Sequence, residues 1–377
     1  MKRPLVIIGS GHAGYTLARA FRQRNQDTPV VILTQDGGED YPKPRLSHGF
    51  GQQVTADQLV VQTASRIAAT SKVMVRPHTR VTAIDFDQQT VIAGDLKIPY
   101  GDLVLAVGAK PFVPPFSGTG ADEVLTLNSL TEYRRYFDCL NASKHVLVIG
   151  GGLIGTEIAQ DIAQHRQVTM VDINERLLAR LVPEQVSRRL QAAMHHVRFR
   201  FNRSVAAIHK EGAALQVELS DGERIAVDSV VCAAGLKPRL DLATGLATQR
   251  GILVDTQLRT SRAHVYALGD CAEIDGKVLP YLQPIMLSAQ ALAKTLTGEP
   301  TAVAFGPMPV AVKTPLLPIQ VGGETDGSHL EWQVSEDEQG LSAKALYQER
   351  LVGYVAAGSH NGFTLMRDLI SAATAQA

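Results

Sequence analysis

Two glycine-rich turns of the same design, 141 positions apart (150 − 9 = 141), constrain this 377-residue chain more than any other feature. The first is Gly9-Ser10-Gly11-His12-Ala13-Gly14, and the second is Gly150-Gly151-Gly152-Leu153-Ile154-Gly155. Each follows a short apolar run typical of a buried parallel strand, residues 5–8 and 146–149, and each opens a helix-like segment. One such motif alone is a weak signal, but two in strand–turn–helix context predict two dinucleotide-binding pockets.

The three glycines of such a turn have different tasks. The first permits the tight turn, the second lets the backbone approach a pyrophosphate, and the third lets helix and strand pack closely. The N–H groups at the start of the helix then attract the phosphates. Alternatively, the glycines only separate strands from helices, an interpretation that the repetition disfavours. The cofactor contacts predicted from the two turns are Gly9, Ser10, Gly11, His12, Ala13, Gly14, Gly150, Gly152, Leu153, Ile154 and Gly155.

The second strands of the two units end on different residues. Asp172 closes the strand at residues 168–171, where a carboxylate accepts hydrogen bonds from adenosine ribose hydroxyls. It would repel a 2′-phosphate, so the second unit is predicted to prefer NADH over NADPH; the alternative is an ordinary aspartate at a strand end. The first unit has Thr34 at the matching place, and Asp36 is an alternative ribose contact there.

Composition excludes several classes of protein. The formal net charge of zero gives no sign of nucleic-acid binding, and no apolar run approaches the roughly 18 residues that span a bilayer. We therefore expect no membrane partner and a cytoplasmic location. The three cysteines are far apart and form no CxxC pair, which argues against a flavin–disulfide reductase. Because the adjacent His195 and His196 cannot both face one ion, no metal site is expected.

The remaining pattern predicts an α/β chain of two Rossmann-like, glutathione-reductase-like dinucleotide-binding domains with a small α+β domain at the C-terminal end. Residues 73–98 and 197–231 alternate as antiparallel strands do, and residues 103–108 and 230–234 read as buried strands. The proline-rich residues 111–115 mark a crossover, and the chain returns to the first unit after Pro238. The predicted domains are residues 1–110 with 239–305, residues 111–238, and residues 306–377.

Several stretches resemble one family. The run Tyr266-Ala267-Leu268-Gly269-Asp270 looks like the second FAD-binding segment of flavoprotein reductases that hold two dinucleotides, and residues 100–108 resemble their central crossover. Within that FAD-dependent pyridine nucleotide oxidoreductase family, the chain is most similar to the NADH-dependent rubredoxin and flavorubredoxin reductases. The stretches that carry this likeness are residues 41–48, 109–115, 125–129 and 267–289.

The resemblance implies roles for further residues. Asp270 would hold the ribityl hydroxyls of the flavin, and Lys43 would reach the flavin near its hydride-accepting nitrogen, paired with Glu157 from the NAD side. Lys313 would lie near the flavin pyrimidine, where a cation favours the anionic reduced form. Lys43 and Glu157 are thus the predicted catalytic residues. The additional predicted cofactor contacts are Thr34, Arg45, Val81, Gly108, Gly235, Gly269 and Leu282.

The resemblance also implies a reaction. NADH reduces FAD, and the flavin delivers single electrons to an acidic iron–sulfur partner, the rubredoxin domain of a flavodiiron nitric-oxide reductase in anaerobic nitric oxide detoxification. Related NADH oxidases carry a redox cysteine in the loop that here reads Leu46-Ser47-His48, so we expect direct transfer from the flavin. Lys43, Arg45 and Lys313 are candidates for a basic docking rim. Two alternatives stay open: a ferredoxin reductase of an oxygenase chain, and a non-catalytic sensor that binds FAD and NADH.

Overall fold

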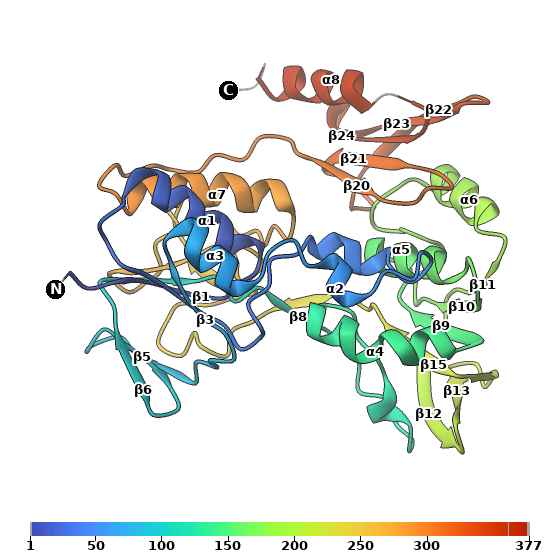
Figure 1. Ribbon diagram of the computed structural model, residues 1–377. Coiled ribbons are helices and arrows are strands. Elements are labelled where there is room, and N and C mark those ends of the chain that lie inside the picture. The colour runs from blue at the N-terminus through green and yellow to red at the C-terminus, as the bar shows by residue number, and fades with distance from the viewer. Residues whose placement is uncertain (1, 361, 375–377) are drawn as a thin grey trace. The chain divides into compact units, whose positions relative to one another are not determined.

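The computed structural model describes residues 2–360 and 362–374, which form two compact units interleaved along the chain (Figure 1). Unit 1 consists of Met1–Lys43, Asp57–Lys110 and Leu236–Phe305. Unit 2 consists of Pro44–Ala56, Pro111–Gly235 and Gly306–Ala377. A short excursion, residues 44–56, thus leaves unit 1 directly after Lys43 and packs with unit 2. The division into three domains with the predicted boundaries stays a prediction.

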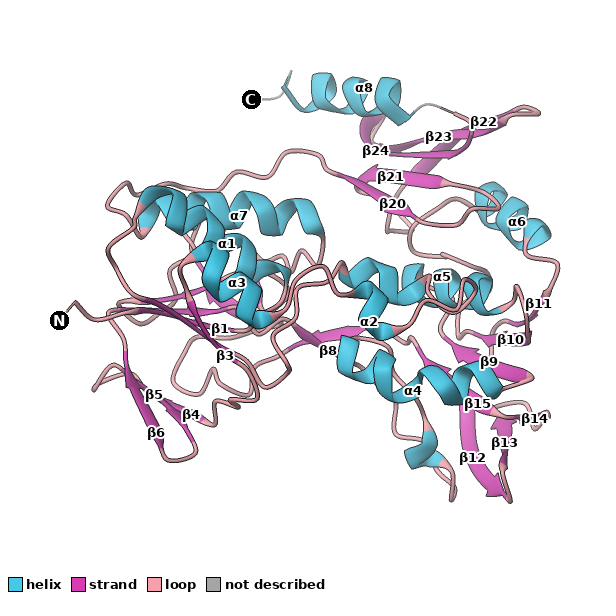
Figure 2. Ribbon diagram, viewed as in Figure 1, coloured by secondary structure: helices cyan, strands magenta, loops and turns pink. Residues whose placement is uncertain are grey.

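Unit 1 is built on a five-stranded parallel sheet with the order β18-β7-β1-β2-β3. Its strands are β1 (Leu5–Ile8), β2 (Val30–Leu33), β3 (Met74–Arg76), β7 (Asp102–Leu105) and β18 (Val265–Ala267). The apolar runs that predicted β1 and β2 are buried at every position. The helices of this unit are α1 (His12–Arg24), α3 (Ala64–Ser71) and α7 (Leu282–Thr295), with α2 (Ala56–Leu59) where the chain re-enters it. Figure 2 shows α1, α3 and α7 gathered on one face of the sheet.

The prediction for residues 73–98 is wrong at its start. Residues 83–99 do form an antiparallel meander, but β3 is a parallel edge strand beside β2. The sequence of a three-residue edge strand does not show whether its neighbour runs parallel or antiparallel to it. The alternation of apolar and polar residues therefore led to the wrong prediction of an antiparallel pair. The meander consists of β4 (Ala83–Asp85), β5 (Thr90–Ala93) and β6 (Leu96–Pro99). A parallel pair, β17 (Ile252–Val254) and β19 (Ala272–Ile274), completes the unit.

Unit 2 repeats the plan with a four-stranded parallel sheet in the order β11-β10-β9-β15. Its strands are β9 (His145–Ile149), β10 (Gln167–Val171), β11 (Val197–Arg200) and β15 (Ser229–Cys232). The prediction of antiparallel pairing from residue 197 is wrong for β11, which is again a parallel edge strand. The antiparallel strands that follow are β12 (Val205–Glu211), β13 (Ala214–Leu219) and β14 (Arg224–Val227). The helices are α4 (Leu130–Ala142), α5 (Leu153–Ile162) and α6 (Glu184–Ala193).

The C-terminal part of unit 2 is an antiparallel sheet with the order β20-β21-β24-β23-β22 and a last helix, α8 (Gly362–Thr374). Its strands are β20 (Pro309–Val312), β21 (Ile319–Gly323), β22 (Glu331–Glu336), β23 (Gly340–Tyr347) and β24 (Arg350–Gly358). Leu365 and Leu369 of α8 pack on Tyr354 of β24. Arg180 and Arg189, from the region of α6, bind Asp326 and Glu336 of this part.

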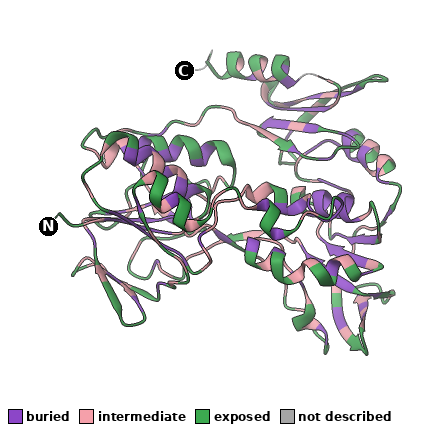
Figure 3. Cartoon of the chain, in the orientation of Figure 1, coloured by how far each residue is buried: buried purple, intermediate pink, exposed green. Residues whose placement is uncertain are grey.

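Short elements mark the connections between these parts. They are the 3-10 helices η1 (Lys43–Ser47) and η2 (Ala121–Glu123), and the paired strands β8 (Ala109–Pro111) and β16 (Leu236–Pro238). Figure 3 shows burial concentrated on the parallel strands and on the inner faces of their helices. In the described part of the chain, no helix has the length and apolarity needed to cross a membrane.

Candidate functional site

The glycine turn of unit 1 has the geometry that a pyrophosphate requires. Gly9 adopts φ +116, and a Cβ there would overlap the carbonyl oxygen of Ala106. A Cβ on Gly14 would overlap the carbonyl oxygen of Gly9, so helix α1 approaches the strand as closely as backbone allows. A Cβ on Gly11, by contrast, would meet no atom within 4 Å. The open side of the turn is therefore at the second glycine, in front of the first N–H groups of α1.

The glycine turn of unit 2 reproduces each of these features. Gly150 adopts φ +107 against Ala233, a Cβ on Gly155 would overlap the carbonyl oxygen of Gly150, and Gly152 has no atom within 4 Å of its Cβ position. Gly11 and Gly152 both begin their helices without a side-chain cap. The N–H groups of both helix termini are thus left to a ligand. His12, Ala13, Leu153 and Ile154, also predicted contacts, form these first helical turns.

The residues that end the second strands serve the two turns differently. Thr34 Oγ1 accepts a hydrogen bond from Ser10 Oγ (2.9 Å) and one from the Asp36 N–H (3.3 Å). Asp172 is buried; one of its oxygens accepts the Gly151 N–H, and Oδ1 accepts the N–H (2.6 Å) and Nδ2 (2.7 Å) of Asn174. The second unit therefore has a fixed negative charge beside its turn, and the first has a neutral hydroxyl.

Asp270 is a half-buried carboxylate of unit 1. It follows Gly269, which has φ +79 and where a Cβ would come within 3.0 Å of Ala13 in the glycine turn. Burial raises the pKa of Asp270, while Lys43 and His12 act in the opposite direction, so both lie within electrostatic reach of Asp270. Burial also raises the pKa of the neighbouring Cys271 thiol to about 11, which leaves it unreactive at neutral pH.

Glu157 is the buried carboxylate of unit 2, with 4% of its surface exposed. It stands on α5, two residues after Gly155, and joins three segments. Its Oε2 accepts the Ser47 hydroxyl (2.7 Å) and lies 3.3 Å from His48 Nε2, at an angle unsuited to a hydrogen bond. Its Oε1 accepts the backbone N–H of Lys313 (2.8 Å). Glu157 is thus held in place by both the excursion and the C-terminal part, and its pairing with Lys43 stays a prediction.

Asp161, one helical turn after Glu157, was not identified from the sequence. Its Oδ2 accepts the N–H groups of Phe50 (2.8 Å) and Gly51 (2.9 Å), and burial raises its pKa despite these two bonds. Together Glu157 and Asp161 fasten the excursion to α5. The signal that would have found Asp161 is the i,i+4 spacing of two carboxylates on a helix in which an isoleucine directly follows each of them.

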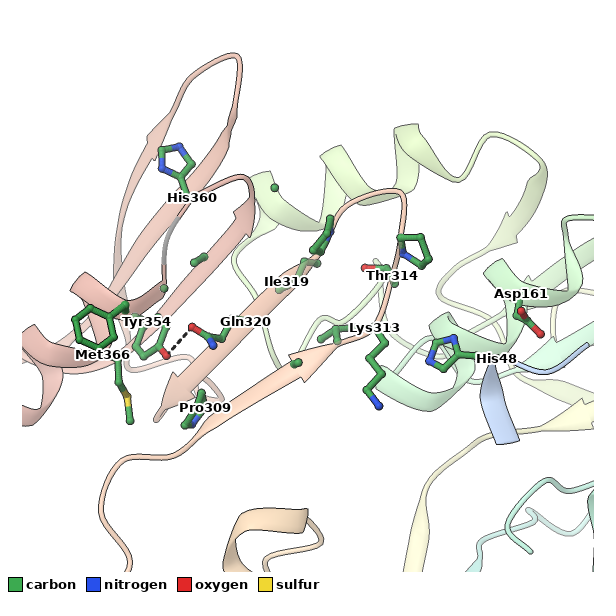
Figure 4. A pocket seen from close by; sticks show the side chains of 18 of the residues that line it. His48, Asp161, Pro309, Lys313, Thr314, Ile319, Gln320, Tyr354, His360 and Met366 are labelled. Atoms are coloured by element: carbon green, nitrogen blue, oxygen red, sulfur yellow. Dashed lines mark hydrogen bonds between the residues drawn. The ribbon is translucent and has the colours of Figure 1, made fainter. Parts of the chain in front are cut away.

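A pocket of about 790 Å³ opens beside Glu157. His48 and Asp161 lie at one end of it and Tyr354 and Met366 at the other, with Lys313 between them (Figure 4). Most of its lining comes from the C-terminal sheet and the start of α8. Among the residues that the structure describes, no group of acidic, histidine and cysteine side chains is placed to hold a metal ion.

The other predicted site residues lie in several places. Val81 is buried in unit 1, and Leu282 begins α7 with 45% of its surface exposed. Gly108 (φ +67) follows β7, and Gly235 (φ +115) follows β15, in each case after the carboxyl end of a parallel strand. Arg45 is exposed on the excursion. The carboxyl ends of parallel strands are where ligands of such sheets bind.

Comparisons with known proteins agree with this arrangement. Residues 3–295 match the family model "Pyridine nucleotide-disulphide oxidoreductase", and residues 302–368 match "Rubredoxin binding C-terminal domain". A nitric oxide reductase FlRd-NAD(+) reductase of Vibrio vulnificus is 45% identical over 98% of each chain. A rubredoxin-NAD(+) reductase of Alcanivorax borkumensis is 42% identical over 94% of this chain and 95% of that one.

A solved structure has the same architecture throughout. The ferredoxin reductase for the CYP199A2 system of Rhodopseudomonas palustris has a TM-score of 0.86 and 26% identity, covering 94% of this chain and 91% of that one. The match therefore extends over nearly the whole of both chains. The chain belongs to the pyridine nucleotide-disulphide oxidoreductase family, and its last domain is of the rubredoxin-binding type.

Proposed function

We propose that this protein oxidises NADH and, through FAD, reduces the rubredoxin domain of a flavodiiron nitric-oxide reductase. The observation that carries the proposal is the pair of glycine turns with the same geometry, each open at its second glycine, in a chain that ends in a rubredoxin-binding domain. FAD, when bound, accepts two electrons from NADH and releases them one at a time. Relatives with 45% and 42% identity over nearly the whole chain bear names of this activity.

The residues present fit the two cofactors. We assign FAD to unit 1, where Gly9, Gly11 and Gly14 shape the turn and Asp270 supplies a half-buried acceptor for hydroxyl groups. We assign NADH to unit 2, where Gly152 leaves space at the start of α5 and Asp172 stands at the end of β10. As part of this proposal the protein acts in the cytoplasm, where NADH is produced.

Lys43 and Glu157 have positioning tasks in this scheme. Glu157 is buried and is held by the Ser47 hydroxyl and the Lys313 N–H, so its carboxylate has one orientation. A cation and a fixed carboxylate at the two sides of the site would orient a nicotinamide and a flavin for transfer, which depends on alignment more than on proton chemistry. Burying the Glu157 carboxylate costs free energy that a merely structural role seldom repays.

The test is NADH oxidation by the purified yellow holoenzyme with a rubredoxin and a plant-type ferredoxin as alternative acceptors. We expect fast and selective reduction of rubredoxin, with a rate that falls as salt rises because the partner is acidic. Slow turnover with both acceptors would favour the sensor hypothesis. Preference for ferredoxin would leave fold and cofactors intact and assign the protein to an oxygenase chain.

The ferredoxin alternative has one specific observation in its favour, the close structural match to a ferredoxin reductase. That match has 26% identity, whereas the relatives named for rubredoxin or flavorubredoxin reach 42% and 45%. The domain match over residues 302–368 also names rubredoxin. Rubredoxin is therefore the acceptor that the chain supports best.

A further inference from the structure

We propose that the pocket between Glu157 and helix α8 is the surface on which the rubredoxin partner docks, with Phe363 as its main apolar contact. This inference rests on the proposed function and extends it, because it assigns the partner to one face of the rubredoxin-binding domain. The face consists of Lys313, Phe363, Met366, Arg367 and Ile370, and is called the α8 face below.

The position of the pocket is the first argument. Its inner end is formed by His48 and Lys313, the two residues that also contact Glu157, at 3.3 Å and 2.8 Å. Its outer end is formed by Phe363 and Met366 of α8 (Figure 4 labels Met366 there). A protein seated on the domain along this pocket thus reaches His48 and Lys313, and Lys313 is the residue expected near the flavin. An electron acceptor requires such a position, because the flavin is its donor.

The second argument is the amphipathic pattern of α8. Leu365 and Leu369 face the sheet and are buried, whereas Phe363 is 71% and Ile370 45% exposed. Phe363 and Ile370 lie two turns apart and share an outward side of the helix, while Met366 between them is half-buried against the inner cluster. An exposed aromatic beside other apolar side chains is typical of the centre of a protein–protein interface.

Charge supplies the third argument and selects the occupant. Lys313 is exposed at the inner end, and Arg367, also exposed, lies one turn after Phe363 on α8. Most of the domain's acidic side chains lie on β22 and the loops at its two ends, where Asp326 and Glu336 bind arginines of unit 2. Asp368, the one acidic residue of α8 in the described part of the chain, is paired with Lys344 of β23 (3.1 Å). An apolar stripe flanked by cations complements an acidic protein with an apolar contact patch, which is the expected character of a rubredoxin.

The experiment compares two substitutions in the same domain. Phe363→Glu places a carboxylate on the α8 face, and Tyr347→Glu places one on β23, where Tyr347 is 43% exposed and does not line the pocket. In holoenzyme with a rubredoxin as acceptor, we expect Phe363→Glu to raise the KM for rubredoxin at least about tenfold. Tyr347→Glu should leave it unchanged. Phe363→Ala, which adds no charge, should raise the KM about threefold to fivefold. Calorimetric binding of the same rubredoxin should weaken in the same order.

Each other outcome overturns the proposal in a recognisable way. An unchanged KM in both Phe363 variants, with rapid reduction of rubredoxin by the wild type, rejects the α8 face and leaves the proposed function standing. If Phe363→Glu and Tyr347→Glu raise the KM for rubredoxin equally, the added negative charge repels the partner at any place on the domain, and the α8 face is rejected. If sedimentation detects a wild-type dimer that Phe363→Glu dissociates, the occupant is a second copy of this chain. A wild type that reduces no rubredoxin overturns the proposed function and the docking face together.

Discussion

The two glycine turns are equal in their backbone and different in the side chains that surround them. Gly14 and Gly155 are each packed on the carbonyl oxygen of the first glycine of their turn, and Gly11 and Gly152 each face open space. However, α1 has Thr16 and Ala20 at the positions where α5 has Glu157 and Asp161. The glycine backbone that both turns share forms a pyrophosphate site. The side chains that differ determine which other segments the helix binds.

The presence of carboxylates on α5 and their absence from α1 give the two units different roles. Helix α1 offers no carboxylate in its sequence, so unit 1 is suited to retaining a cofactor. Helix α5 uses two buried carboxylates to hold the excursion from residue 44 to residue 56, so unit 2 both binds a dinucleotide and fixes a loop of the site. Each prediction below tests one part of this comparison.

The largest effect is expected from the third glycines. Gly14→Ala and Gly155→Ala each place a methyl group on a backbone oxygen that cannot move without displacing the strand, and should cost about 3 kcal/mol of unfolding free energy or more. Gly11→Ala and Gly152→Ala, the matched controls, meet no atom and should preserve the fold while weakening FAD or NADH binding respectively. Urea unfolding and cofactor titration distinguish the two classes. Equal stability of all four variants would contradict the packing role.

Next in size is the effect on flavin reduction. Lys43→Met and Glu157→Gln should each slow reduction of the flavin by NADH about tenfold to a hundredfold in stopped flow, because alignment is lost. The amide oxygen of glutamine can still accept the Lys313 N–H, and its NH2 group can donate to the Ser47 hydroxyl oxygen, so Glu157→Gln removes the charge while keeping the size of the side chain. An unchanged rate would return Lys43 to the status of an ordinary surface lysine.

A smaller effect is expected at the ends of the second strands. Asp172→Ala should lower the preference for NADH over NADPH about tenfold, since a hydrogen bond to a charged group is worth about 1.5–3 kcal/mol. Asp172→Arg should lower it further. Thr34→Val removes the bonds from Ser10 and from the Asp36 N–H in unit 1, and should leave this preference as it is. Steady-state kinetics with both nucleotides decide the matter; if Asp172→Ala retains the wild-type ratio, the ribose assignment is wrong.

The smallest effect is a pH dependence of stability. Burial raises the pKa of Asp161 in unit 2 and of Asp270 in unit 1 above 3.8, so the folded protein keeps protons that the unfolded chain releases. Their stabilising effect is complete below pH 3.8 and is lost as the pH rises through the folded pKa. Asp161→Asn and Asp270→Asn should therefore each flatten the fall in unfolding free energy with pH. Adding FAD should alter the contribution of Asp270 and not that of Asp161.

The sequence predicted what depends on local pattern. The buried strands and the two turns were readable because apolar runs and glycine spacing are properties of neighbouring residues. Strands β3 and β11 were misassigned because an edge strand of three or four residues gives no sign of its partner's direction. The hydrogen bonds that Glu157 and Asp161 of α5 accept were not predicted. Their donors, which are Ser47, Phe50 and the Lys313 N–H, lie more than 100 residues away in the sequence. Backbone donors leave no mark in a sequence.

The interleaving of the units has a consequence for how the chain matures on the ribosome. Unit 1 lacks β18, β19 and α7 until residue 295 has been made, and unit 2 waits for residues 306–374. Residues 44–56 are synthesised early, but the helix that receives them follows about a hundred residues later. Because each unit is built from three separate segments, neither can fold step by step from its N-terminal end during synthesis. Contacts between segments so far apart in the sequence also slow folding. We expect unit 1 to complete its folding only after residue 305 has been made, and unit 2 later still.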